Sequence, residues 1–335
     1  MKSELVSTTI AATALFLTAC SNEVNLIDNW DGRIHLSSNV VTLTRATHNL
    51  DEQIAENEKV WLYVDKTVES TTTTKIYDKE LTAGGDGSFT GDDEMFYPAD
   101  AATISLYALH VNAVGEDGSV TSMPADFPGS TELTHKVEQN QKKSGGNYAK
   151  SDLLFAKVTG QAKEDVIKTS GSIELKFSHL LSKIEVILKE GKGLGSGVTI
   201  DKVEILNTQL KGTFTPSKSN ENSVTAASEE IGGDKNAIEI DCDVTANDVE
   251  PGSESLNEGI IIPQTLEEND AFIQVTLSTG GVLTYKLGAD DNKIFAAGSR
   301  YRYTITANLT GLEVTSTISN WTYDETKDVN GNAGM

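Results

Sequence analysis

Residues 299–309, SRYRYTITANL, carry apolar side chains at every second position. This alternation is typical of a β-strand with one buried and one solvated face. Similar runs, separated by clusters of Gly, Asp, Asn and Ser, recur at 59–66, 103–111, 152–158, 172–177, 182–189, 198–206, 272–278 and 281–287. No segment keeps the apolar spacing of a long helix, so we expect an all-β protein built from sandwiches.

The length and the polar connections predict how these strands are divided. A chain of 335 residues is long enough for two domains at about 150 residues each. The polar stretch 159–172 has Gly near both ends and predicts the division, with the Gly-rich stretch 191–197 as the second candidate. The runs 272–278 and 281–287 predict a hairpin, because the glycines between them allow a tight turn.

The N-terminus predicts export. Residues 5–19 carry no charge and end in small residues, which is typical of a secretory signal. Leu17-Thr18-Ala19-Cys20 resembles the lipobox of bacterial lipoproteins. That resemblance implies that the Cys20 thiol carries acyl chains such as palmitate, which hold the protein at a membrane. The alternatives are a plain signal peptide with an incidental cysteine, or a buried N-terminal helix.

The charge balance excludes some partners. The chain has 50 acidic and 27 basic residues, a net charge of −23. Nucleic acids and anionic membrane surfaces both require basic patches, so we expect neither as a binding partner.

Residues suited to catalysis or metal binding are sparse. Cys242 shares an alternating face with Ile238, Ile240 and Val244, which predicts a buried thiol on a strand. His179 follows a strand, and we expect a structural, hydrogen-bonded role for it. No nucleophile motif, nucleotide loop or metal-ligand spacing is present, so we expect no catalytic residue, cofactor or metal.

Several strings, in this order and spacing, resemble the fimbrillin-like family, the lipoprotein-derived pilus subunits of Gram-negative anaerobes. They are VWLYVD, SDLLFAKV, IELKFSHLLSKIEVILKEG, IIIPQTL, IFAAGSRYRYTITANLTG and VTSTISNW, and they span residues from about 45 to 321. The resemblance implies two tandem transthyretin-like β-sandwich domains.

The resemblance also implies a route of assembly. Subunits reach the outer membrane as lipoproteins, and a trypsin-like protease then cuts after a basic residue that follows the first strand. A strand from a neighbouring subunit fills the groove, which is strand addition. In this chain, residues 33–44 are suited to a strand, so we expect cleavage between Arg45 and Ala46. The alternative is that Arg45 is an ordinary surface residue.

The C-terminal end is less typical of the family. The family's shaft subunits place a donor strand there, but the residues after Trp321 are polar and lack alternation. Either residues 312–321 are the donor, or the subunit donates nothing and sits at a tip. Residues 312–321 could equally form the terminal strand of the second sandwich, and an anchor subunit that keeps its lipid is a third position. The side chains that would fill pockets are those of Leu312, Val314, Ile318 and Trp321.

Together these observations predict a fimbrial subunit, at the tip or in the shaft, that contributes to cell adhesion. It begins as an outer-membrane lipoprotein and ends in the surface fimbrium, with other subunits and the processing protease as partners. The alternative is an uncleaved surface lipoprotein, either a fibre anchor or a monomeric module that binds a glycan or a host protein. The expected division is a signal peptide at 1–19, a propeptide with the first strand at 20–45, sandwiches at 46–168 and 169–322, and a polar tail at 323–335.

Overall fold

The computed structural model describes residues 30–40, 54, 56–69, 72–91, 94–111, 128–129, 132–195, 197–215, 217–218, 225–226, 236–246, 249, 253–321 and 331–332. Strands dominate this part of the chain, and every run that the sequence predicts as a strand forms one. The helical elements among the described residues are α1 (Asn147–Ser151), α2 (Lys163–Lys168) and the 3₁₀ turn η2 (Lys143–Gly145). None of them is long and apolar enough to cross a membrane. The all-β prediction is confirmed.

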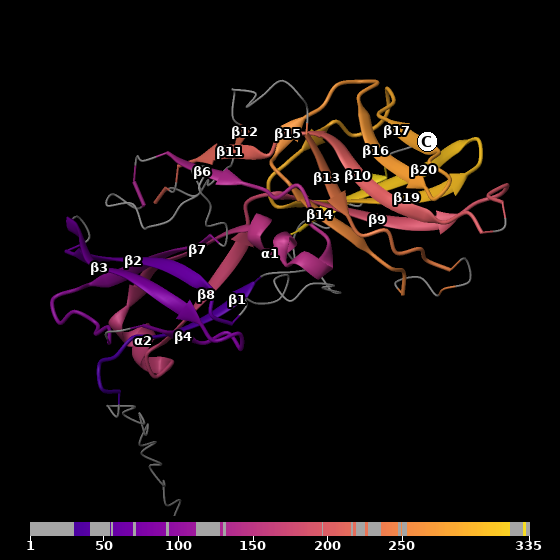
Figure 1. The fold of residues 1–335 in the computed structure, drawn as a ribbon. Coiled ribbons are helices and arrows are strands. Elements are labelled where there is room, and N and C mark those ends of the chain that lie inside the picture. The colour runs from indigo at the N-terminus through magenta and orange to yellow at the C-terminus, as the bar shows by residue number, and fades with distance from the viewer. Residues whose placement is uncertain are drawn as a thin grey trace, which may run out of the picture.

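The first half of the chain forms one large sheet (Figure 1). Its strands, in spatial order, are β1 (His35–Val40), β8 (Ser172–His179), β7 (Leu153–Ala162), β5 (Thr103–Val111), β2 (Lys59–Val68), β3 (Thr72–Ala83) and β4 (Phe89–Thr90). The strand β1 runs parallel to β8, whereas the other neighbours are antiparallel.

Both faces of the middle of this sheet are buried. In β2, Val60, Leu62 and Val64 point into a core that belongs to the first half alone. Trp61 and Tyr63 point the other way, into a core that continues into the second half. Burial on both faces explains why this strand reads as a nearly continuous apolar run.

The second half is built mainly from two facing sheets. The first contains β14 (Asn257–Ile261), β9 (Ser182–Glu190), β19 (Ser299–Asn308), β20 (Gly311–Asn320) and β21 (Gly331–Asn332). The second contains β13 (Asn236–Ile240), β10 (Ile200–Thr208), β16 (Ala271–Leu277) and β17 (Val282–Lys286). The predicted hairpin is confirmed, since β16 and β17 pair antiparallel.

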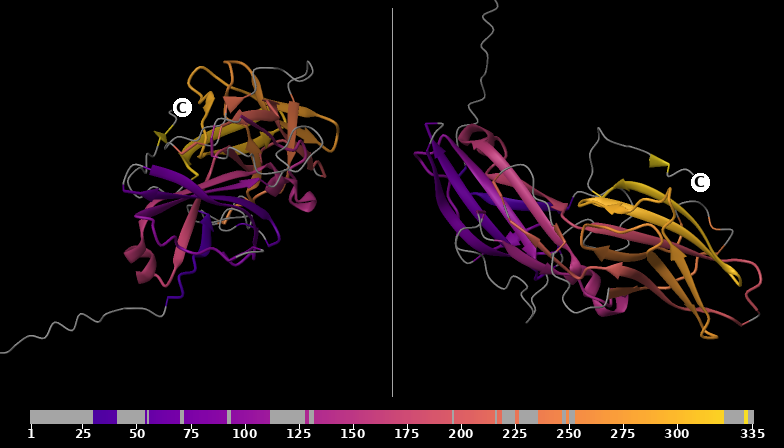
Figure 2. Two further views of the ribbon diagram at one scale, coloured as in Figure 1. Left: turned by 90° about the vertical axis from the view of Figure 1, so that its left-hand side faces the viewer. Right: turned by 90° about the horizontal axis from the view of Figure 1, so that it is seen from above.

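Smaller sheets complete the molecule, and one of them joins the two halves. It consists of β12 (Thr225–Ala226), β11 (Lys211–Phe214) and β6 (Leu133–Lys136), and β6 comes from the first half. The other small sheet pairs β15 (Gln264–Thr265) with β18 (Ile294–Phe295). Figure 2 shows the two halves arranged end to end.

Strand pairing continues across the expected division at 168/169. That point is the end of α2, which connects β7 to β8, and these two strands are hydrogen-bonded neighbours. The chain passes from the first large sheet to the second at residues 180–181, between β8 and β9. The polar stretch 159–172 is thus a connection inside one sheet.

The predicted strand face that includes Cys242 is wrong beyond Ile240, where β13 ends. The chain leaves the ladder there because Asp243 N–H donates to the Asn257 side chain at 2.8 Å. Cys242 is only partly buried, and its Sγ lies 3.6 Å from the Asp201 carbonyl oxygen.

Candidate functional site

The strand β1 turns alternate side chains into the first core. Ile34, just before the strand, is 6% exposed, and Val40, at its end, is 2% exposed. Leu36 packs partly buried against the same core. Ser38 is the remaining inward position of the alternation. The side chains that β1 turns toward the core are therefore apolar, except for the small polar Ser38.

One side of β1 is held by β8. The two strands pair in parallel from His35 opposite Ser172 to Val40 opposite Phe177. The pairing begins where His35 N–H donates to the Gly171 carbonyl oxygen at 2.8 Å. The backbone of β8 therefore pairs with β1 along the whole length of β1.

The other side of β1 is held by the segment that surrounds β4. Ser38 N–H donates to the Gly87 carbonyl oxygen at 2.6 Å, and Ile34 N–H donates to that of Met95 at 2.8 Å. Tyr97 N–H donates to the Gly32 carbonyl oxygen at 2.9 Å. Because β8 and β4 lie near opposite ends of the strand order, β1 fills the gap between the two ends of the sheet. We call this gap, between Gly171 and β8 on one side and residues 87–91 and 94–97 on the other, the β1 slot.

Two glycines show how closely the slot fits its strand. Gly87 has a φ of +85°, and a Cβ added there would lie 2.8 Å from the Ser38 carbonyl oxygen. Gly171 also has a φ of +85°, and its added Cβ would lie 2.4 Å from the Arg33 carbonyl oxygen. Any other residue would be strained and would push the strand away. The sequence analysis missed both, because a glycine that borders a slot cannot be distinguished from a turn glycine without the fold.

Side chains fasten the entrance to the slot. The Trp30 indole N–H donates to the Arg33 carbonyl oxygen at 2.5 Å, and its ring meets Tyr97 edge-on at 6.2 Å. The Arg33 guanidinium lies 2.9 Å from Asp31 and 2.6 Å from Glu94. These ion pairs are solvent-exposed, so they contribute less than the backbone pairing.

The residues predicted from the sequence fall in different places. Cys20, Arg45 and Ala46 lie outside the described residues, as do the signal peptide and most of the polar tail. The candidate donor residues 312–321 form β20 and the residue after it. All of β20 pairs with β19. Its side chains Leu312, Val314 and Ile318 are partly buried, and Trp321 is 3% exposed.

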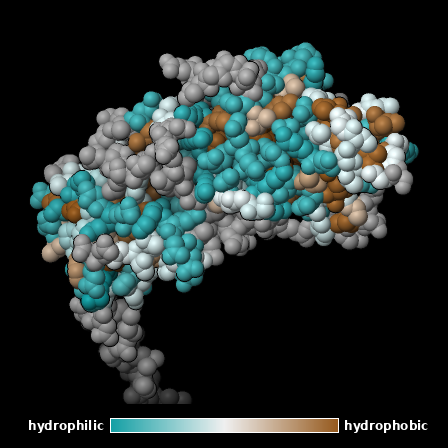
Figure 3. Space-filling view, in the orientation of Figure 1, coloured by the Kyte–Doolittle hydropathy of each residue, from teal (hydrophilic) through white to brown (hydrophobic). Residues whose placement is uncertain are grey.

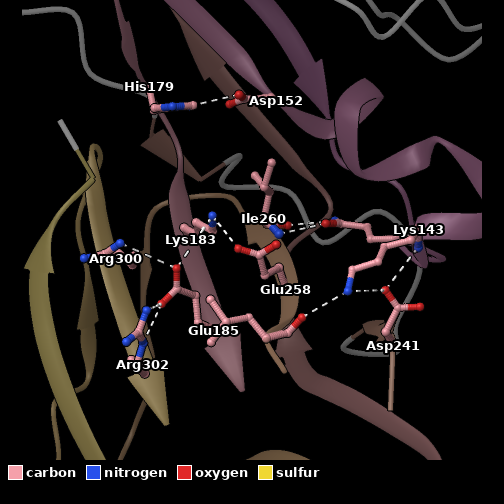
Figure 4. A network of polar contacts seen from close by, with 12 residues as sticks. Lys143, Asp152, His179, Lys183, Glu185, Asp241, Glu258, Ile260, Arg300 and Arg302 are labelled. Carbon is pink, nitrogen blue, oxygen red and sulfur yellow. Dashed lines mark hydrogen bonds and ion pairs between the residues drawn. The ribbon is translucent and has the colours of Figure 1, made fainter. Parts of the chain in front are cut away.

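A buried polar network lies where the two halves meet (Figure 4). The His179 imidazole bonds to the Asp152 carboxylate at 2.9 Å and stacks on the Trp321 ring at 3.7 Å. Lys183 Nζ lies 2.6 Å from Glu258 Oε1 and 3.6 Å from Glu185 Oε1. All of these side chains are almost fully buried. The end of β20 is therefore fastened to the joint between the halves.

The charges of the network are balanced by their neighbours. Arg302 lies 2.7 Å from Glu185, which gives that buried carboxylate a second cation. Burial raises the pKa of Asp152, but the charge and hydrogen bond of His179 outweigh it, so the pKa of the carboxyl lies below its ordinary value. Paired buried charges of this kind fix one arrangement of the surrounding strands, because breaking one pair leaves the other charge unpaired.

Among the described residues, no hydroxyl or thiol group is hydrogen-bonded to the His179 imidazole. The second ring nitrogen of His179, Nε2, has no hydrogen-bond partner among the described residues. The same residues contain no cluster of three or more His, Cys, Asp or Glu arranged to hold a metal ion. The expected structural role of His179 agrees with its bond to Asp152 and its stack on Trp321.

Comparisons with known proteins agree with this architecture. A family model described as fimbrillin-like matches residues 44–321 of the chain. A Bacteroides uniformis protein, provisionally named fimbrium subunit Fim1C, is 26% identical over 347 aligned positions, which cover 99% of this chain and 100% of that protein.

Solved structures share the fold. A Bacteroides uniformis protein provisionally assigned to cell adhesion is 21% identical, with a TM-score of 0.57, over 87% of this chain and 99% of its own. A fimbrial protein of Bacteroides vulgatus is 16% identical, with a TM-score of 0.50, over 87% of this chain and 99% of its own.

Proposed function

Because the chain belongs to the fimbrillin-like family, we propose that it is a fimbrial subunit that accepts a β-strand from a neighbouring subunit and contributes to cell adhesion. The observation that carries this proposal is the β1 slot. A single short strand, at the N-terminal end of the described chain, is hydrogen-bonded on both sides and fills the gap between the two ends of the sheet. We further propose that the two halves are tandem transthyretin-like sandwiches.

Processing would begin from a lipoprotein. Cys20 would carry the lipid that anchors the precursor to the outer membrane, and a trypsin-like protease would cut between Arg45 and Ala46. The strand β1 ends at Val40, so this cut would separate it from the rest of the chain. The family match begins at residue 44, beside the proposed site, and leaves β1 outside it.

Loss of β1 would make a replacement strand necessary. Returning Ile34 and Val40 to water would cost about 3–6 kcal/mol for these two side chains alone. That is a large part of the stability of a whole domain, which is about 5–15 kcal/mol. The freed edge of β8 would also be open to uncontrolled pairing. A donor strand with the same inward pattern restores both the burial and the backbone pairing.

The pattern of β20 bears on where the subunit sits in the fibre. Its inward residues are similar in kind to those of β1, so on composition β20 could serve as a donor. It is, however, paired with β19 along its length and fastened through Trp321 to the joint. This favours a subunit that accepts a strand without donating one, which is a tip position, over a shaft position. The inward residues compared are Ile34, Leu36, Ser38 and Val40 in β1, and Leu312, Val314, Ser316 and Ile318 in β20.

One observation favours the alternative of an uncleaved lipoprotein. In the intact chain β1 is well bonded in its own slot, so a fibre anchor or a monomeric binding module would need no partner strand. Both proposals assign the chain a structural or binding role rather than a catalytic one.

Replacing Arg45 by Ala tests cleavage, with Arg33→Ala as the matched control on the other side of β1. The proposal expects Arg45→Ala to abolish incorporation into surface fibres and Arg33→Ala to permit it. Normal fibres from the Arg45→Ala variant would contradict it.

A further inference from the structure

The second half of the molecule has one covered side and one open side. On the covered side, next to β13 and β14, Asn140 bridges to Glu239, and Gln141 exchanges hydrogen bonds with the Ile260 backbone at 2.7 and 2.8 Å. On the other side, β17, the edge strand of one sheet, lies next to β20, which only the two-residue strand β21 follows in the other sheet. We call the surface formed by these two strands the β17–β20 edge.

Most of the backbone at this edge has no strand partner among the described residues. The strand β17 pairs with β16 on one side only. The strand β20 pairs with β19 along its length, and on its outer side only Thr317 and Ile318 pair with a described strand, β21. Among the described residues, no other strand pairs with the outer side of β20.

This edge carries few charges for a chain of net charge −23, and most of its exposed side chains are uncharged. Val282 is 55% exposed. The only charged residues in the two strands are Lys286 and Glu313. In Figure 3, white and brown residues gather at the end of the second half where Figure 1 labels β17 and β20. The partly buried apolar side chains that these strands turn toward the core are Leu283, Tyr285, Leu312, Val314 and Ile318.

Another edge of the same chain is protected in the usual way. The outer side of β3 carries charged residues, and the pairing of β2 with β3 is interrupted by a bulge after Val64. Charges and bulges prevent edge strands from pairing with other chains. The charged residues of β3 are Lys75, Asp78, Lys79 and Glu80. The β17–β20 edge has no comparable row of charges. The strand β20 pairs with β19 without a break, whereas the pairing of β17 with β16 is irregular between Ala271 and Ile273.

We propose that the β17–β20 edge is a strand-addition surface and that its occupant in the free subunit is the chain's own C-terminal segment, residues 322–335. The register is given by β21, in which Asn332 pairs with Thr317 and Gly331 with Ile318. The segment is polar, with Asp324, Glu325 and Asp328 against Lys327. A strand that is added at an edge is held by backbone hydrogen bonds, so the polarity of this segment does not prevent pairing. The net negative charge of the segment also repels other copies of an acidic chain.

This assignment is independent of cleavage at Arg45 and of the β1 slot. It gives the polar tail a protective role, which is to cover an edge that would otherwise pair with the edge of a second copy. Without the tail, copies would associate side by side through this surface.

The test compares the full chain with a chain that ends at Trp321. Hydrogen exchange at the amides of residues 311–319 should be at least about tenfold faster in the shortened chain at low concentration, because the covering strand is lost. At higher concentration, light scattering should detect side-by-side association. Adding Thr284→Lys and Thr315→Lys to the shortened chain should return it to the state of the full chain, because charged edges resist pairing.

A second variant keeps the length of the tail. Asn332→Pro removes one backbone donor from β21 and should speed exchange at Thr317 and Ile318, with Pro251→Ala, far from this edge in the sequence, as the control. Unchanged exchange at residues 311–319 in both the shortened chain and the Asn332→Pro variant would overturn the proposal. The Arg45→Ala experiment would be unaffected by that result.

Discussion

The Ser38 amide donates to the Gly87 carbonyl oxygen at 2.6 Å across 49 residues of sequence, and so joins the first strand to the far end of its sheet. This bond lies on the side of β1 opposite β8, and with the pairing to β8 it makes β1 an inserted strand. The same closeness requires glycine at position 87, because a side chain there would meet the Ser38 backbone.

Replacing Gly87 by Ala should loosen β1. The left-handed φ costs about 1–2 kcal/mol for a non-glycine residue, and the new Cβ also presses on the strand. We expect a lower free energy of unfolding in urea and faster proteolysis of the segment that contains β1. Gly160→Ala is the matched control, since Gly160 has a φ of +67° and no atoms within 4 Å of the added Cβ. An equal loss in the free energy of unfolding of the two variants would mean that the contact between position 87 and β1 contributes nothing to stability.

The slot should select strands by their inward pattern. A chain cut after Arg45 and freed of the preceding segment should bind a peptide of residues 33–41, RIHLSSNVV. At 100 times its dissociation constant, the peptide should stabilise the cut chain by about 2.7 kcal/mol. A control peptide with Leu36→Asp and Val40→Asp should not stabilise it, because carboxylates would enter the core. Thermal unfolding with each peptide makes the comparison, and equal effects would refute pattern recognition.

The buried network should be intolerant of losing one partner. Lys183→Met leaves Glu258 without the cation 2.6 Å away, and breaking a buried pair in this way costs about 3–5 kcal/mol. Adding Glu258→Gln should recover part of that loss, because the carboxylate that has lost this cation is replaced by a neutral amide. Denaturant unfolding of the single and double variants measures the coupling. Lys168→Met, which breaks an exposed pair with Asp165, should leave the stability almost unchanged.

Stability should decline in mild acid because of His135. Burial lowers the pKa of this imidazole below its ordinary value of 6.5, although the bond of its Nε2 to the Ser151 carbonyl oxygen acts in the opposite direction. The unfolded chain therefore binds a proton that the folded chain does not, and stability falls as the pH drops below about 6.5. Asp152 affects the free energy of unfolding only at lower pH. Because its pKa is lowered in the folded chain, the stability that this carboxylate contributes is lost only below its ordinary pKa of 3.8.

Urea unfolding at pH 7.5 and 5.5 measures this dependence. His135→Gln should reduce the difference in stability between the two pH values, whatever its effect at pH 7.5. His35→Gln, at an exposed position of β1, should leave the difference as it is. A difference that persists unchanged in His135→Gln would assign the acid sensitivity to another group.

The strands could be predicted from the sequence, but the slot could not. Runs such as 103–111 became strands with the expected bounds, because apolar alternation and turn residues are local signals. The expected division at 168/169 was placed at a polar stretch. That stretch is the connection through α2 between two paired strands, and the polarity of a segment does not reveal which strands pair.

The buried network could not be predicted from the sequence for a related reason. Lys183 and Glu185 read as an ordinary alternation of charges on a strand, and their partners lie far along the chain. Arg302 is separated from Glu185 by 117 residues. Only the packing of the two halves brings these charges together, and only the fold distinguishes Gly87 and Gly171 from turn glycines.

The most direct measurement is the N-terminal sequence and intact mass of the protein recovered from the cell surface. The account predicts a chain that begins at Ala46 and carries no lipid, with the β1 slot filled by another subunit. A chain that begins at acylated Cys20 and retains β1 would contradict strand exchange in this slot, and would identify the protein as a fibre anchor or a monomeric surface lipoprotein.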